Sequence, residues 1–340
     1  MIDSSPKRTI SLKANLMNLF RLNLRPLLLC LCAATLLAWG PIGHMTVGWA
    51  AYQRLTPATK ARVRDLLKLN PDYPNWDKQI PTGTSPEEHD QSIFMMATVW
   101  PDDIKGESQY HDDGPDPGGN IPDGAGSSLN TGYSDLLRHR YWHFVDLPFS
   151  PDYTALPAIP TPNAQTQIDA FRAVLAGSQS DELKSYDLVW LLHLVGDVHQ
   201  PLHATTRATQ ADPQGDAGGN KVRLKGDADT NLHAYWDDLP GSDCQYCNKK
   251  MPCVARAVVL GQDLPEAPEK LARDAKTDTW VHESFEAARS DVYRAPIGSN
   301  DGPYTIVPWS QYEARANRLA RQRIALAGAR LAAVLNQELK

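Results

Sequence analysis

Two short stretches each pair a histidine with an aspartate four residues later. His193 and Asp197 lie in HLVGDVHQPLH, and His233 and Asp237 lie in NLHAYWDD. Residues four apart share one face of a helix, so the imidazole and the carboxylate of each pair can converge on one ion. Mixed nitrogen and oxygen ligands suit zinc. One such pair is usually a surface ion pair or a capped core histidine, but its repetition favours a metal cluster.

Three further histidines, His44, His143 and His203, lie in short motifs with apolar or small neighbours. An imidazole buried in such surroundings without a polar partner would destabilise the fold. Metal ions shared with the two His/Asp pairs would satisfy these rings. The pattern therefore predicts a cluster that draws ligands from widely separated parts of the chain.

The first 38 residues have the layout of a secretory signal peptide. Five Lys and Arg side chains precede the apolar run 27–38, which is too short to span a membrane comfortably. Cleavage after Ala38 would leave Trp39 at the N-terminus, and a retained anchor is the alternative. We expect a signal peptide over 1–38, one domain over 39–340, and a secreted or periplasmic protein without stable membrane association.

Charge and cysteine content add two constraints. The net charge of −6 would become −10 after cleavage, through the loss of five positive and one negative side chains. Such an acidic chain needs local positive charge to bind a phosphate substrate, and divalent metal ions supply it. Cys244, Cys247 and Cys253 remain after cleavage. An exported protein most simply forms one disulfide among them, with the pairing left open.

Hydrophobic periodicity favours an all-α fold. About 300 residues with 42% apolar content can bury one large core, and a monomer is the default expectation. The clearest strand is 220–226, where Val222 and Leu224 alternate with basic residues, and we expect a short β-hairpin there. Segments 106–133 and 148–162, rich in glycine or proline, predict long irregular loops. The predicted helices are 45–54, 57–69, 86–99, 164–176, 181–195, 266–293 and 310–339.

Six motifs, in this order, resemble the zinc-dependent single-strand-specific nucleases of fungi, plants and bacteria, which share their fold with bacterial zinc phospholipases C. They are WGPIGH at 39–44, VWPDDIK at 99–105, YWHFVDLP at 141–148, HLVGDVHQPLH at 193–203, GGNKV at 218–222 and NLHAYWD at 231–237. The resemblance implies a multi-helix endonuclease that hydrolyses single-stranded DNA and RNA to 5′-phosphate products. It leaves 3′-nucleotidase activity, and any preference among these substrates, open.

The family pattern assigns ligands to three zinc ions. A hydroxide activated by the first and third ions would attack the phosphodiester, and the second ion would stabilise the leaving 3′ oxygen. Trp39 is expected to bind through its free α-amine and carbonyl, so uncleaved protein should be inactive. His199 is not a ligand in the pattern, and we interpret it as supporting the site. The expected ligands are Asp102, His143, His193 and Asp197 for the first zinc, His203, His233 and Asp237 for the second, and Trp39, His44 and Asp197 for the third.

The resemblance also implies catalytic and substrate-binding residues. Asp102 would orient the attacking water, and Lys105 would contact the developing negative charge, although a lone lysine in a polar turn is more often solvated. Phe144 would stack a base while Asp146 and Asn220 bind its edge, which suits single strands. The alternative is that Phe144 belongs to the core and Asp146 caps a turn.

Two other functions stay open at this stage: a zinc-dependent phospholipase C, and an exported zinc-binding protein without enzymatic activity. The WGPIGH and GGNK motifs favour the nuclease over the phospholipase. Ligand sets rich in His and Asp, with positions open for water, favour an enzyme over a structural zinc site. The insert 106–133 and the three-cysteine stretch have no counterpart in the family pattern.

Overall fold

The computed structural model describes Met1 and residues 39–113, 130–225, 230–239, 241 and 250–340. The predicted signal peptide, most of the insert 106–133, and Cys244 and Cys247 therefore fall outside the described residues. Cys253 is described and is buried near the start of a helix. None of the helices in the described ranges combines the length and the apolar character needed to cross a bilayer.

The described chain is mostly helical, which confirms the predicted all-α class. Six helices lie within a few residues of the predicted ranges. Five of them begin where the side chain of a Ser, Thr or Asn accepts a hydrogen bond from a backbone N–H of the first turn. The six are α1 (Pro41–Tyr52), α2 (Pro57–Leu67), α4 (Pro86–Ala97), α6 (Ala164–Ala176), α7 (Asp181–Asp197) and α12 (Gln311–Glu338).

The prediction of one continuous helix over 266–293 is wrong. The backbone instead forms α10 (Glu269–Ala272), α11 (Thr277–Ala287) and the π-helical turn η6 (Ala288–Val292). Between α10 and α11, the Asp274 carboxylate accepts a hydrogen bond from the backbone N–H of Lys276. A local side-chain bond of this kind competes with helical hydrogen bonding and starts a new turn.

Several short elements were not predicted because they contain too few residues to show a period. Five of them carry side chains of the candidate site. The helices are α3 (Tyr73–Asp77), α5 (Trp100–Asp103) and α8 (Leu232–Asp237). Helix α9 (Met251–Gln262) was also not predicted, although its 12 residues are enough to show a period. The 3₁₀ turns are η1 (Ile104–Gly106), η3 (Gly132–Ser134), η4 (Arg140–His143) and η5 (Pro201–Ala204).

The two named strands lie outside the predicted hairpin. β1 (Pro148–Phe149) pairs in parallel with β2 (Thr206–Arg207). The predicted strand 220–226 does pair antiparallel with the chain around 230–232, because Leu224 N–H donates to the Thr230 carbonyl and Leu232 N–H to the Val222 carbonyl. This pairing amounts to a single antiparallel bridge, which is too short to form a ladder.

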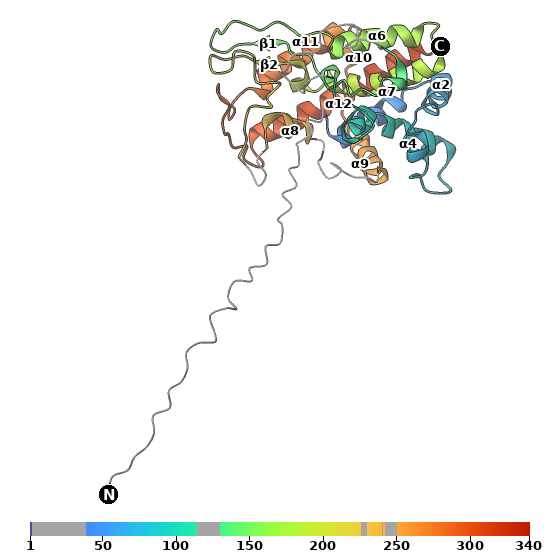
Figure 1. Cartoon of the computed structure of the whole chain (residues 1–340), viewed down its shortest axis with the longest axis horizontal. Coiled ribbons are helices and arrows are strands. Elements are labelled where there is room, and N and C mark those ends of the chain that lie inside the picture. The colour runs from blue at the N-terminus through green and yellow to red at the C-terminus, as the bar shows by residue number, and fades with distance from the viewer. Residues whose placement is uncertain (2–38, 114–129, 226–229, 240, 242–249) are drawn as a thin grey trace. The chain divides into compact units, whose positions relative to one another are not determined.

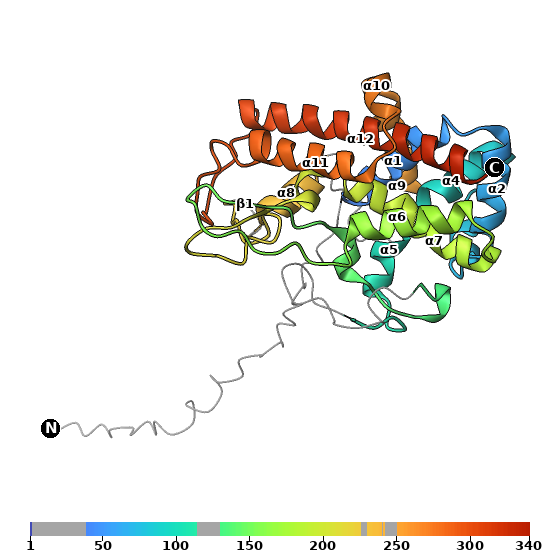
Figure 2. The same cartoon turned by 90° about the horizontal axis from the view of Figure 1, so that it is seen from above.

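Helix α7 lies at the centre of the bundle. Every residue from 185 to 197 is buried, as expected for a helix surrounded by other helices. Its neighbours in contact include α1, α2, α6 and α12, and α12 runs the length of the bundle (Figure 2). Figure 1 shows β1, β2 and α8 gathered at one end and α2 and α4 at the other. His193 and Asp197, at the C-terminal end of α7, therefore lie in the interior of the bundle.

Candidate metal centre

The side chains predicted as zinc ligands lie together in the interior, although they come from six elements. The geometry allows three groups, each close enough to share one ion. All of these side chains are buried. They are His44 on α1, Asp102 on α5, His143 on η4, His193 and Asp197 on α7, His203 on η5, and His233 and Asp237 on α8.

The four residues expected at the first zinc converge. Asp197 Oδ2 lies 3.1 Å from His143 Nδ1 and 3.3 Å from His193 Nε2, and these two nitrogens are 3.0 Å apart. Asp102 Oδ1 lies 3.9 Å from the His143 nitrogen and 3.6 Å from the His193 nitrogen. The helical spacing of four therefore directs His193 and Asp197 to one point, as predicted.

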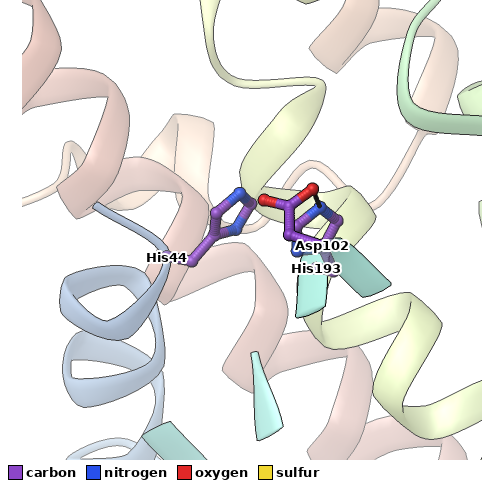
Figure 3. A group of neighbouring side chains, drawn as sticks. All are labelled: His44, Asp102 and His193. Atoms are coloured by element: carbon purple, nitrogen blue, oxygen red, sulfur yellow. Dashed lines mark ion pairs between the residues drawn. The ribbon is translucent and has the colours of Figure 1, made fainter. Parts of the chain in front are cut away.

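His44 approaches the same place from α1. Its Nε2 lies 3.3 Å from Asp197 Oδ1, so the two oxygens of this carboxylate face different histidines. The His44 ring also stacks on His193, with centroids 3.8 Å apart and planes 13° apart. Figure 3 shows His44, Asp102 and His193 directed toward one another, and these three also form one of the groups that could share an ion.

His203 and His233 provide the clearest sign that a cation belongs here. The Nδ1 atoms of these rings each lie 2.7 Å from a backbone carbonyl, of His143 and Gly218, so each Nδ1 must carry the proton. The Nε2 lone pairs of the two neutral rings then face each other at 3.1 Å. Asp237 adds its carboxylate 3.4 Å from His233 Nε2. A bound cation converts this repulsive arrangement into ligation.

Trp39 anchors the start of the predicted mature chain beside these groups. Its side chain is buried, and the indole N–H donates a hydrogen bond of 3.0 Å to the Gly196 carbonyl. The next residue, Gly40, donates its backbone N–H to the Asp237 carbonyl, also at 3.0 Å. Residue 39 therefore lies between the end of α7 and the end of α8, which carry Asp197 and Asp237.

Burial sets the protonation of the histidines. It lowers the pKa of His193 to about 3, assisted by the positive charge of Lys105, and the pKa of His233 to about 4. It also lowers the pKa values of His44, His143 and His203 well below their usual value. These rings are therefore neutral at pH 7, which is the form that binds a metal ion.

The carboxylates of the cluster show the opposite shift. Burial, with the negative charge of Asp102, raises the pKa of Asp197, and burial likewise raises the pKa of Asp237. A nearby cation would reverse these shifts. Several buried polar atoms also have no hydrogen-bond partner within the described part of the chain, and metal ligation would satisfy those that face the cluster, such as His44 Nε2 and Asp197 Oδ1. The atoms without a partner there include both ring nitrogens of His44, His143 Nε2, Asp102 Oδ2 and Asp197 Oδ1.

Lys105 is not a solvated surface residue. Its side chain is only 2% exposed, and its ammonium donates a hydrogen bond of 2.8 Å to Asp102 Oδ1. A buried cation beside the cluster can act on negative charge that develops there. Gln200, which was not predicted, holds the second group because its amide donates to Asp237 Oδ1 at 2.7 Å. Its position inside the HLVGDVHQPLH motif was the available signal.

A cavity joins the cluster to the predicted substrate residues. Phe144, Asp146 and Asn220 line it together with Lys105 and three of the histidines. Phe144 also packs against the core, as its alternative interpretation holds. Asp146 does not cap a turn, since no backbone hydrogen bond to its carboxylate occurs in the described ranges, and burial raises its pKa to about 7. Asn220 Oδ1 is buried without a hydrogen-bond partner there.

His199 points away from the cluster. Its Nδ1 donates to the Val195 carbonyl, and its Nε2 accepts a hydrogen bond of 3.0 Å from Arg330 on α12. Arg323 of the same helix donates to the His199 carbonyl. Glu283 on α11 pairs with both arginines. This buried network fixes the turn between Asp197 and His203, which agrees with the interpretation of His199 as a supporting residue.

Comparison with known proteins gives a consistent result. Residues 39–340 match the family model described as S1/P1 nuclease. Two similar curated proteins come from Arabidopsis thaliana. Endonuclease 4 is 27% identical over 327 residues, covering 88% of this chain and 89% of its own. Endonuclease 3 is 26% identical over 307 residues, covering 86% and 87% respectively.

Proposed function

Because the chain belongs to the S1/P1 nuclease family, we propose that it is a secreted or periplasmic zinc-dependent endonuclease that cleaves single-stranded DNA and RNA to 5′-phosphate products. Membership supports hydrolysis of phosphodiester bonds. The observation that carries the metal dependence is the pair of neutral imidazoles of His203 and His233, whose Nε2 lone pairs face each other at 3.1 Å beside Asp237.

We propose three zinc ions, with the ligand sets expected from the family pattern. When bound, they would supply an activated water and positive charge on the phosphoryl and departing oxygens. In this scheme the Asp102 carboxylate accepts a hydrogen bond from the attacking water and orients it. Lys105 holds Asp102 by a 2.8 Å hydrogen bond and keeps a positive charge at the cavity wall.

The chain's own residues also supply a place for the base. Phe144 offers an aromatic face in the cavity, and Asn220 offers an unpartnered buried carbonyl oxygen. A base of a single strand can reach these side chains without the cost of unpairing, whereas a duplex must first open. This difference supports a single-strand preference for the proposed nuclease.

The first test uses protein that begins at Trp39, supplied with zinc. We expect it to release acid-soluble nucleotides from single-stranded DNA. This release should stop when a chelator is added and resume when zinc is restored. Phosphatidylcholine is tested in parallel. Cleavage of the lipid alone would identify a phospholipase, and cleavage of neither substrate by zinc-loaded protein would reject both enzymatic functions.

A matched form with one residue added before Trp39 tests the proposed ligand role of the α-amine. The extension converts the amine into an amide, which no longer binds a metal ion as a free amine does. We expect less bound zinc and a loss of more than about 100-fold in activity, since even residues that only support metal ligands contribute about 10- to 100-fold. Equal activity of the two forms would exclude a ligand role for Trp39.

A further inference from the structure

A row of basic side chains begins at the edge of the cavity. In the segment 220–225, Val222 and Leu224 are buried, while Lys221, Arg223 and Lys225 are exposed. Alternate residues of an extended segment project to the same side. The three basic side chains therefore share the outer face of a segment whose inner face packs into the core.

The backbone of this segment is held on both edges. On one side Leu224 N–H donates to the Thr230 carbonyl, and on the other Lys225 N–H donates to the Tyr304 carbonyl. Arg223 donates its N–H to the Asp301 carbonyl and accepts from Tyr304 N–H. A backbone paired in this way fixes the positions from which the Arg223 and Lys225 side chains extend.

Arg223 and Lys225 line a groove of about 540 Å³. Asn220 lines both the groove and the cavity beside His203 and His233. Asn231 forms another part of the groove wall and also caps α8, the helix that carries His233. The groove is therefore built on the same elements as the candidate metal centre.

The two groove cations, Arg223 and Lys225, differ from Lys221 in their ion-pair partners. Lys221 is paired with Asp212, at 2.6 Å, and with the Gly215 carbonyl. Among the described residues, neither Arg223 nor Lys225 has a carboxylate within ion-pair distance; the Arg223 guanidinium makes only a 3.5 Å contact with the Gly302 carbonyl. Their charge is thus available to an external anion, in a chain whose net charge is −6.

We infer that this groove binds the backbone phosphates of a single-stranded nucleic acid beyond the nucleotide held in the cavity. The inference rests on the proposed function and extends it from one nucleotide to a strand. Arg223 and Lys225 would contact successive parts of the strand, since residues two apart on an extended segment lie roughly 7 Å from each other. Sequence-independent phosphate contacts of this kind raise affinity and make it sensitive to salt.

The test compares two double variants of the zinc-loaded enzyme that change the net charge equally. Arg223→Ala with Lys225→Ala removes the groove cations. Lys221→Ala with Lys270→Ala removes one paired cation of the same segment and one exposed cation on α10. The specificity constant kcat/KM is measured at several salt concentrations for a dinucleotide and for a single strand of about twelve nucleotides.

We expect the groove variant to lose activity on the long strand and to keep it on the dinucleotide, which has no internucleotide phosphate beyond the scissile one. Two lost phosphate contacts should reduce the slope of log kcat/KM against log salt by about 1.4. Between about 50 and 200 mM salt, the wild type should then lose about sevenfold more activity than the groove variant. The control variant should match the wild type in both respects.

The outcomes separate this inference from the function on which it rests. If the wild type cleaves both substrates and the two double variants behave alike, the groove does not bind the strand, and the nuclease proposal stands. Equal losses on dinucleotide and long strand would also overturn the inference, because they would place the effect in the cavity. If the zinc-loaded wild type cleaves neither substrate, the proposed function fails.

Discussion

Gly196 illustrates how closely single residues determine the candidate metal centre. It precedes Asp197 on α7, and a Cβ atom at this position would lie 2.9 Å from Nδ1 and 3.1 Å from Cε1 of His44. His44 is fully buried, so it cannot simply swing into solvent. A methyl group at residue 196 would therefore displace an imidazole that lies 3.3 Å from Asp197.

We predict that Gly196→Ala lowers zinc content by up to one ion per chain and reduces nuclease activity about 10- to 100-fold, the range for residues that position ligands. The helix itself should form, because alanine favours a helix over glycine by about 1 kcal/mol. Metal analysis, activity and circular dichroism check this prediction. Gly106→Ala is the control, since a Cβ atom there meets nothing within 4 Å. Full zinc content and wild-type activity in Gly196→Ala would contradict it.

The sequence predicted part of this residue-level picture. His193 with Asp197, and His233 with Asp237, could be grouped from their spacing alone, because a helix brings residues four apart together. The approach of His44 to Asp197 and of His143 to His193 joins residues far apart in the chain. Local periodicity contains no information on such contacts, and only the resemblance to a family grouped these residues beforehand.

At the scale of elements, capping residues explain which helices were predicted well. Asn163 and Ser180 cap α6 and α7 through their side chains, and both helices begin at the predicted residue. Helix α8 has only six residues, and no periodic pattern can show in so few. Its position depends on packing of Leu232 and Trp236 into the smaller core cluster, which is a property of the fold.

The connection that leads into η4 contains a buried charged cluster. The His139 ring lies 2.7 Å from Asp113 and 3.0 Å from Asp135, and it stacks on Trp142 at 3.5 Å. Tyr141 donates its hydroxyl to Asp113. Burial by itself lowers the pKa of His139, but its hydrogen bonds to the two aspartates and their charges raise it above the usual 6.5. Despite burial, the same contacts lower the pKa of Asp113 below 3.8.

These shifts predict a defined pH window of stability. The imidazolium contribution is fully present below pH 6.5 and is lost as pH rises through the raised pKa of His139. The Asp113 contribution is present above pH 3.8 and is lost as pH falls through its lowered pKa. The cluster should therefore stabilise the fold most between about pH 4 and pH 6.5.

We predict that His139→Gln lowers the free energy of unfolding by about 3 kcal/mol at about pH 6, because it leaves two largely but not fully buried carboxylates without their cation. The loss should shrink as pH rises to about 9. Urea denaturation of both proteins across this range measures the difference. His282→Gln serves as the control, since His282 is exposed on α11. A difference that stays constant with pH would show that His139 is not charged in the folded protein.

At the scale of the whole molecule, the candidate metal centre lies where several elements of the core converge. Helices α1, α7 and α8 and the short elements α5, η4 and η5 all contribute buried side chains that could bind a metal ion. Five histidines and three aspartates are buried there. Most of the polar groups in such an interior must be paired for the fold to be stable, so metal binding and folding should be coupled.

Coupling of this kind makes the stability of the fold depend on zinc. A ligand that binds only the folded state stabilises it, by about 4.1 kcal/mol when the free ligand concentration is 1,000 times the Kd of the site. Removal of zinc from one such site by a chelator should therefore lower the melting temperature by about 8 to 16 °C, given about 2 to 4 °C for each kcal/mol. Return of zinc should restore it, in proportion to the logarithm of the free zinc concentration.

Calorimetry of protein beginning at Trp39, with and without chelator, measures the effect. His193→Ala provides the internal comparison, because removing a ligand of the proposed first ion should reduce both the zinc content and the chelator-induced shift. A melting temperature that does not respond to zinc in the wild type would mean that something other than zinc stabilises the facing Nε2 lone pairs of His203 and His233. The zinc-dependent mechanism would then lose its main support, although membership of the nuclease family would stand.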